Sequence, residues 1–130
     1  MRAGRPETAE ELQPDALQID NYLISTPSRT TLLEVKGDSM QDAGLIQGDV
    51  VIVERGTPAK PGDIIVAVVD GEFTLKYLML DELGEFYLKP ANSKYPNIRP
   101  TQSLEVYGLV VGQFRRYRRS KNSNQHIYQC

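Results

Sequence analysis

The amino-acid sequence predicts a mostly β domain of short antiparallel strands, preceded by a flexible N-terminal arm. Runs of β-branched and aromatic residues recur at close spacing, which is typical of strands. Gly-Asp and Asp-Gly pairs, which favour turns, stand before several of these runs. No long segment has the apolar periodicity of an amphipathic helix. We therefore expect a single, nearly all-β domain, which a chain of 130 residues accommodates.

The chain divides by composition into an arm, a domain and a tail. Residues 1–20 contain Gly, Pro and many charges without a sustained apolar period, which predicts a flexible arm. Residues 21–119 carry the strand-like runs and form the expected domain. Residues 120–130 are polar and are expected to be a tail.

Six runs within the domain are expected to be strands: residues 32–35, 50–53, 64–69, 73–80, 85–89 and 104–114. Between the third and the fourth of these runs, Asp70-Gly71 is a good two-residue hairpin turn, because glycine accepts the positive φ that a tight turn demands. Residues 64–69 and 72–80 should therefore pair as antiparallel neighbours.

Composition argues against several classes of function. The single cysteine, Cys130, can form neither an internal disulfide nor a cysteine cluster, so zinc is not expected. We also expect no other metal and no cofactor. A net charge of −2 disfavours duplex DNA as the main ligand, and we expect no direct sequence-specific DNA binding. The chain lacks the roughly 18 consecutive apolar residues of a membrane helix, and its N-terminus is polar. These features predict a cytoplasmic protein without membrane contact.

The end of the domain is basic, with four arginines in residues 115–119. The favoured interpretation is a solvated end to the last strand. The alternative is a docking patch for nucleic acid or for an acidic partner surface.

The residues available for nucleophilic chemistry are few. The only histidine, His126, lies in the polar tail together with Cys130, so a Ser-His-Asp or Cys-His site would have to use that tail. A serine with a lysine base is the remaining familiar arrangement.

Lys76 is the candidate base. Strand alternation over residues 73–80 places Lys76 on the same face as Leu78 and Leu80. If that face is covered, desolvation lowers the lysine pKa from about 10.4 toward the range of about 7 to 8 that suits a general base. The alternative is an edge-strand lysine whose stem lies along apolar surface and whose ammonium stays in water.

Ser39 is the candidate nucleophile, within the sequence Gly37-Asp38-Ser39-Met40. A sharp turn at this point would present its hydroxyl and neighbouring backbone N–H groups to a substrate carbonyl, giving a nucleophile and an oxyanion hole together. The alternative is a serine that caps a turn or a helix end.

Both candidates belong to a series of motifs that runs in order along the chain: residues 37–40, 43–45, 48–53, 62–64, 70–76, 92–96 and 106–110. Taken together, over about residues 19–114, the series resembles the peptidase domain shared by LexA, UmuD and phage repressors. The resemblance implies a mostly β fold whose paired strands are curled around the site, and a self-cleaving serine peptidase with a Ser-Lys dyad.

The resemblance also implies a role for each residue of the site. Ser39 would be the nucleophile, unprotonated Lys76 the general base, and the backbone N–H groups of Asp38 and Ser39 the oxyanion hole. The bond cut would be Ala3-Gly4 in the chain's own arm, since relatives often cut an Ala-Gly or Cys-Gly bond upstream of an acidic, proline-containing stretch.

Among such relatives, residues 19–24, 27–28, 37–40 and 70–74 look more like UmuD than LexA. A UmuD-like chain would act in the SOS response to DNA damage. It would form a homodimer, partly through the apolar run at residues 109–111, cleave itself when stimulated by a RecA filament on single-stranded DNA, and join a UmuC-like, error-prone translesion polymerase. The first alternative is the C-terminal autocleavage and dimerisation domain of a LexA-like or phage repressor. A pure binding module and a signal-peptidase-like enzyme are the others.

Overall fold

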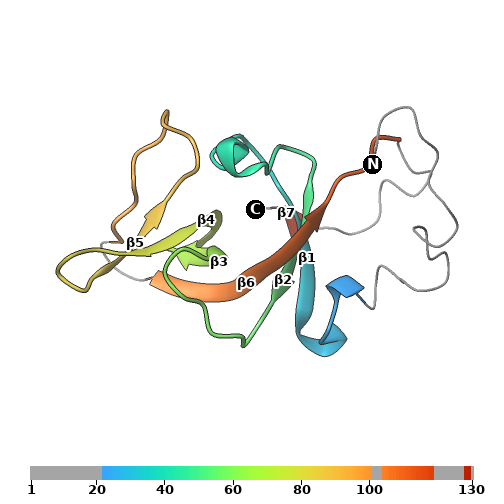
Figure 1. The fold of residues 1–130 in the computed structure, drawn as a ribbon, viewed down its shortest axis with the longest axis horizontal. Helices are drawn as coiled ribbons and strands as arrows, with labels where there is room; N and C mark the ends of the chain where they lie inside the picture. The colour runs from blue at the N-terminus through green and yellow to red at the C-terminus, as the bar shows by residue number, and fades with distance from the viewer. Residues whose placement is uncertain (1–21, 101–103, 119–127, 130) are drawn as a thin grey trace, which may run out of the picture.

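The computed structural model describes residues 22–100, 104–118 and 128–129. Within these residues the strands form one open sheet in the order β5-β4-β3-β6-β2-β1-β7 (Figure 1). Their bounds are β1 (Thr30–Glu34), β2 (Val50–Glu54), β3 (Ile64–Val69), β4 (Glu72–Leu80), β5 (Phe86–Lys89), β6 (Leu104–Phe114) and β7 (Tyr128–Gln129). Two short 3-10 helices, η1 (Pro27–Arg29) and η2 (Gln41–Ala43), flank β1.

The predicted fold class is confirmed. Each of the six expected runs forms a strand, and β1 to β6 pair with their neighbours in antiparallel fashion. The sheet is open and continuous, however, without the curling that the resemblance implied. Strand β7 was not expected, because it lies in the segment predicted to be a tail, and it pairs in parallel with β1. The predicted arm, residues 1–20, lies outside the described residues.

The hairpin between β3 and β4 forms as predicted. Asp70 and Gly71 have φ angles of 49° and 88°, and the positive φ at both positions matches the right-handed twist of the strands that they join. Because the turn fixes the register of the hairpin, Lys76 in β4 lies opposite Ile65 in β3. The turn residues therefore set the position of Lys76 along the sheet.

Strand β6 joins the two halves of the sheet (Figure 1). It pairs with β3 through Leu104–Leu109 and with β2 through Leu109–Phe114, and the register shifts once along each pairing. Such irregularities act as β-bulges, which bend a strand and increase its twist. The bends allow one strand to follow two differently oriented partners.

Apolar residues cover both faces of β3. Val66 belongs to a cluster with Leu33, Met40 and Leu75, whereas Ile65 packs with residues of a second cluster. Neighbouring residues of a strand point to opposite faces, so the two clusters lie on opposite sides of the sheet. The first cluster includes Met40, and the core therefore anchors the segment that carries Ser39.

The described part of the basic run, residues 115–118, is exposed, as the favoured interpretation predicted, but Arg115 also has fixed partners. Arg115 donates two hydrogen bonds to the carboxylate of Asp49, at 2.6 and 2.8 Å, and a third to the carbonyl of Gly44 at 3.1 Å. Asp49 is completely buried and also accepts a bond from the N–H of Ile46. Arg115 thus has a structural partner, while Arg119 lies outside the described residues.

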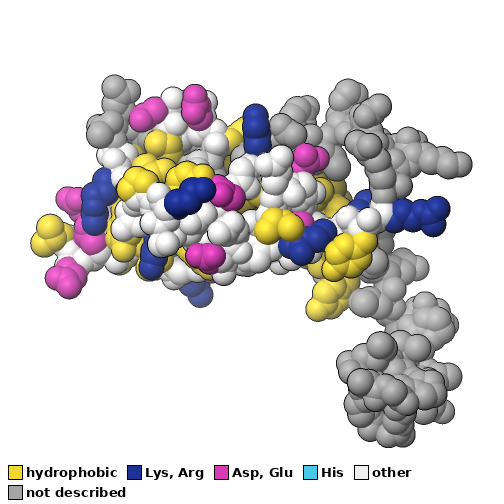
Figure 2. All heavy atoms as spheres, turned by 90° about the horizontal axis from the view of Figure 1, so that it is seen from above, with side chains coloured by type: hydrophobic (Ala, Val, Ile, Leu, Met, Phe, Trp, Pro, Cys, Tyr) yellow, Lys and Arg dark blue, Asp and Glu magenta, His cyan; other side chains and the backbone are white. Residues whose placement is uncertain are grey.

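The surface carries mixed charge. Figure 2 shows basic, acidic and hydrophobic side chains interspersed on the face seen from above. Among the described residues no helix is long and apolar enough to cross a membrane.

Replacement of Asp49 by asparagine tests the contribution of the ion pair between Asp49 and Arg115 to stability. The hydrogen bonds from Arg115 hold the pKa of the Asp49 carboxyl below its ordinary value, although burial acts in the opposite direction. A carboxyl whose pKa is lowered by folding contributes stability above its unfolded pKa and loses that contribution as the pH falls through its folded pKa. We expect Asp49→Asn to lower the free energy of unfolding by about 1.5 to 3 kcal/mol at neutral pH, and by progressively less below about pH 4.

Urea denaturation at several pH values measures this difference. The control is Asp42→Asn, which removes an exposed carboxylate and should change the stability by less than about 0.5 kcal/mol. A deficit for Asp49→Asn that is equally large in acid and at neutral pH would contradict the assignment.

Candidate active site

Ser39 lies in the irregular segment between β1 and η2. Gly37, which precedes Ser39, and Gly44, which follows η2, both have a φ of 82°. Residues other than glycine rarely adopt this left-handed backbone conformation. The side chain of Met40 is buried in the core, whereas Ser39 is half-buried. The glycine turn and the methionine anchor therefore hold the serine hydroxyl at the edge of the core.

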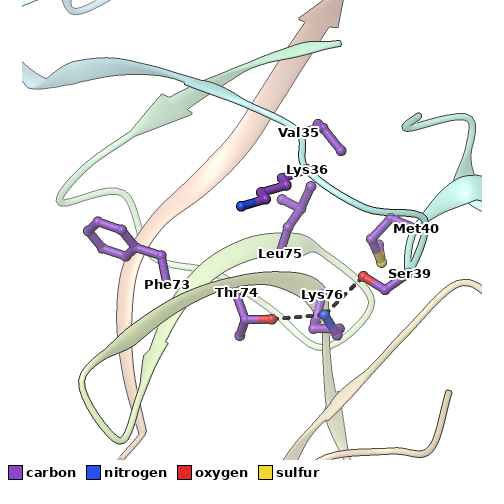
Figure 3. A pocket seen from close by; sticks show the side chains of 8 residues that line it. All are labelled: Val35, Lys36, Ser39, Met40, Phe73, Thr74, Leu75 and Lys76. Carbon is purple, nitrogen blue, oxygen red and sulfur yellow. Dashed lines mark hydrogen bonds between the residues drawn. The ribbon is translucent and has the colours of Figure 1, made fainter. Parts of the chain in front are cut away.

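Lys76 is buried in the middle of β4, with only 8% of its surface exposed. Its Nζ lies 3.1 Å from Ser39 Oγ and 2.8 Å from Thr74 Oγ1, and it donates to both hydroxyls (Figure 3). Thr74 and Lys76 are two residues apart on a strand and so share a face. The structure thus brings together the two side chains that the sequence singled out, and the interpretation of Lys76 as an exposed edge lysine is wrong.

A cavity of about 220 Å³ adjoins this contact. Its lining residues are Val35, Lys36, Ser39, Met40, Phe73, Thr74, Leu75 and Lys76. Figure 3 shows that Ser39 and Lys76 point toward one another and that Lys36 lies apart from them. Phe73 contacts the ring of Tyr107 edge-on, with 5.0 Å between the ring centroids. The site is therefore a small recess of mixed apolar and polar lining, in which the amine of Lys76 contacts the hydroxyls of Ser39 and Thr74.

The profile of the Peptidase S24-like family matches residues 1–111. The chain belongs to this family. Its members include self-cleaving serine peptidases. The contact between Ser39 and the buried Lys76 therefore occurs in a protein whose family includes enzymes that cleave peptide bonds.

The curated relatives that match this chain include LexA repressors and a differently named protein, SamA. The LexA repressors of Verrucomicrobium spinosum and Carboxydothermus hydrogenoformans are 44% and 40% identical to this chain, over 72% and 88% of its length. Protein SamA of Salmonella typhimurium is 36% identical over 84% of the chain. The matched part spans about half of each LexA repressor, 46% and 56%, but 76% of SamA.

A second segment of this S24-like domain, residues 91–95, packs against the Ser39 turn. The N–H of Ala91 donates to the carbonyl of Ser39 at 2.8 Å, and the amide of Asn92 donates to the carbonyl of Asp38 at 2.9 Å. The Asp38 carboxylate accepts bonds from Tyr95 and from Lys94.

These bonds shift three pKa values. The hydroxyl of Tyr95, and then the ammonium of Lys94, hold the pKa of Asp38 below its ordinary value. The same contacts raise the pKa of Lys94 and of Tyr95. The carboxylate beside the serine is therefore ionised at neutral pH and held by its two partners.

The predicted oxyanion donors lie in the turn that the second segment supports. Among the described residues, no atom accepts a hydrogen bond from the backbone N–H group of Asp38 or of Ser39. Their role stays a prediction, and so does cleavage at Ala3-Gly4, which lies outside the described residues.

Sequence reasoning missed two contributors to the site. Thr74 had a usable signal, since a hydroxyl two residues from Lys76 on a strand shares its face. Asn92 had none beyond its place in one of the motifs, because its contact with the carbonyl of Asp38 spans 54 residues of sequence.

Proposed function

We propose that this chain is a serine peptidase that cleaves its own N-terminal arm, with Ser39 as the nucleophile and Lys76 as the general base. The observation that carries the proposal is the 3.1 Å contact between Ser39 Oγ and the amine of a buried lysine. A lysine that has lost its proton can accept the serine proton across the same contact. Burial favours that neutral form, because a low-dielectric site destabilises the ammonium.

The cleavage reaction follows from these roles. Ser39 Oγ bonds to the carbonyl carbon of Ala3 as Lys76 takes the hydroxyl proton, and the carbonyl oxygen becomes an oxyanion. The N–H groups of Asp38 and Ser39 stabilise that charge. The bond to Gly4 then breaks, and the Lys76 ammonium returns the proton to the leaving amine. Water hydrolyses the resulting ester with Lys76 again acting as base, which regenerates Ser39.

Thr74 has a supporting role in this scheme. Its hydroxyl accepts a hydrogen bond from Lys76 Nζ at 2.8 Å, which limits the positions that the amine can occupy. A general base must lie within hydrogen-bond reach of the proton that it takes, so this second contact favours the productive geometry.

The wider role that we propose is that of a UmuD-like protein of the SOS response, which becomes an accessory subunit of an error-prone translesion polymerase after self-cleavage. The high coverage of two short relatives supports this choice, since the match spans 76% of SamA and 75% of Protein ImpA of Salmonella typhimurium. The second candidate is the autocleavage domain of a LexA-like repressor, which the 44% and 40% identity to LexA repressors favours. A helix-turn-helix encoded directly upstream of Met1 would decide for the repressor.

The partners belong to the same proposal. They are a second copy of the chain, a RecA filament on single-stranded DNA and a UmuC-like polymerase. Residues 1–20 would form the arm that is cut, residues 21–119 the peptidase and dimerisation domain, and residues 120–130 a tail. Sedimentation as a monomer at tens of micromolar would argue against the dimer.

The peptidase proposal predicts that the purified chain slowly loses residues 1–3 and that Ser39→Ala does not. Without its hydroxyl, residue 39 has no atom that can attack a carbonyl, so cleavage should fall below detection at every pH. Mass spectrometry of the intact chain measures the loss, and circular dichroism verifies that the variant is folded. Cleavage by Ser39→Ala at the rate of the unchanged chain would refute the proposal.

A further inference from the structure

The segment of residues 91–95 holds the Ser39 turn by its backbone. The carbonyls of Asp38 and Ser39 both accept hydrogen bonds from this segment, and the N–H of Asp42 donates back to the carbonyl of Ala91 at 2.8 Å. Two consecutive peptide units of the turn are therefore fixed from one side. Neither Ala91 nor Asn92 lines the cavity beside Ser39.

The bond from Asn92 orients one particular N–H group. The carbonyl of Asp38 and the N–H of Ser39 belong to the same peptide unit, in which they point in opposite directions because the unit is planar and trans. Asn92 Nδ2 donates to that carbonyl at 2.9 Å, beside a longer bond of 3.2 Å from the N–H of Gln41, and neither Asn92 nor Gln41 is among the residues that line the cavity. The N–H of Ser39 is thereby turned away from Asn92.

We propose that Asn92 is the positioning residue of the oxyanion hole: by holding the carbonyl of Asp38 it aims the N–H of Ser39 at the oxyanion that forms during cleavage. This inference rests on the proposed peptidase function and adds a residue to it. Asn92 does not touch the reacting atoms and acts only through the peptide unit that it binds.

Asparagine suits this position because it uses both ends of its amide. Asn92 Oδ1 accepts the N–H of Lys94 at 3.0 Å, which leaves Nδ2 directed at the carbonyl of Asp38. The side chain is also buried, with 8% of its surface exposed, so water competes little for these bonds. The contacts of Lys94 and Tyr95 with the Asp38 carboxylate are exposed and hold a side chain rather than the peptide unit.

Two variants of Asn92 test the assignment in the full chain. Asn92→Asp keeps an acceptor for the N–H of Lys94 but cannot donate to a carbonyl when ionised, whereas Asn92→Ala removes both bonds without adding charge. We expect each variant to lower the plateau rate of self-cleavage at high pH by about 10-fold or more, since loss of an oxyanion donor lowers rates by about 100-fold to 1,000-fold. The pH at which Asn92→Ala reaches half of its own plateau should match that of the unchanged chain.

The matched control is Thr30→Val, which also removes a bond from a side chain to a backbone carbonyl, at 2.7 Å to Thr26, but at the far end of β1. It should lower the unfolding temperature and leave the plateau rate unchanged. All rates are measured by mass spectrometry, at a temperature where circular dichroism shows each variant to be folded. A folded Asn92→Ala or Asn92→Asp protein that reaches the normal plateau would overturn the assignment. A normal plateau reached at a shifted pH in Asn92→Ala would also overturn it, because Asn92 would then act through Lys76.

These outcomes are distinct from failure of the peptidase proposal. If the unchanged chain does not cut, or if Ser39→Ala still cuts, the proposed function itself is wrong. If cutting depends on Ser39 and Lys76 but not on Asn92, only the positioning role is lost.

Discussion

Self-cleavage is expected to accelerate with rising pH, to level off, and to disappear in the Lys76→Ala variant. Only the neutral amine of Lys76 can take the proton of Ser39, so the rate should follow the fraction of unprotonated lysine and stop rising once that fraction is complete. Loss of a general base typically lowers a rate by about 100-fold to 10,000-fold. Lys76→Arg should be equally inert, because a guanidinium remains protonated throughout this range.

A second lysine of the cavity, Lys36, provides the matched control for this experiment. Lys36 also lines the recess but is exposed and has no described hydrogen bond to Ser39, so Lys36→Ala should retain the pH profile of the unchanged chain. Rates are taken from mass spectra of the intact chain over a series of buffers, and circular dichroism establishes that each variant is folded. A folded Lys76→Ala protein with the original rate and pH profile would exclude the Ser-Lys mechanism and favour a pure binding module.

The second large effect is expected on stability, from Gly108→Ala in β6. A Cβ atom at this position would lie 2.5 Å from Val53 Cγ1 and 3.0 Å from the carbonyl oxygen of Glu54. Val53 is completely buried, so neither it nor the backbone of β2 can move aside without disturbing the core. We expect the free energy of unfolding to fall by about 1 to 3 kcal/mol, as for other overpacked cores.

Gly112 lies on the same strand and supplies the comparison. A Cβ atom there would meet Ile52 and Leu23 at 3.5 Å, which is ordinary van der Waals contact. Gly112→Ala should therefore leave stability unchanged or raise it by up to about 1 kcal/mol, because alanine restricts the unfolded chain. Urea denaturation of the two variants side by side measures the difference. Equal stability of the two would mean that β6 and β2 are not packed as described.

The strands and the first hairpin were predictable because they depend on neighbouring residues. The continuous, mostly β-branched run of β3 and the alternation in β4 both favour strands, and Asp70-Gly71 adopts the positive φ angles that join them tightly. Strand β7 was not predictable in this way. Its two residues, Tyr128 and Gln129, pair with Leu33 and Glu34 of β1 across 95 residues of sequence, and so short a segment has no periodicity of its own.

The two principal residues of the candidate site, Ser39 and Lys76, were predictable, but the geometry of the site was not. With the single histidine and the single cysteine both in the polar tail, a serine with a lysine base was the remaining familiar arrangement for nucleophilic chemistry. Alternation assigned Lys76 to an apolar face, and the family resemblance singled out Ser39. Alternation identifies a face but not the segment that packs against it.

Only the tertiary structure decided that Ser39 packs there, 37 residues away in sequence, and that Asn92 supports its peptide unit across 54 residues. Such contacts depend on the register of β3 with β4, on the bends of β6 and on the burial of Met40, all of which arise when the core assembles. Local propensity acts over a few residues, whereas the distance between two catalytic atoms is set by packing of the whole domain.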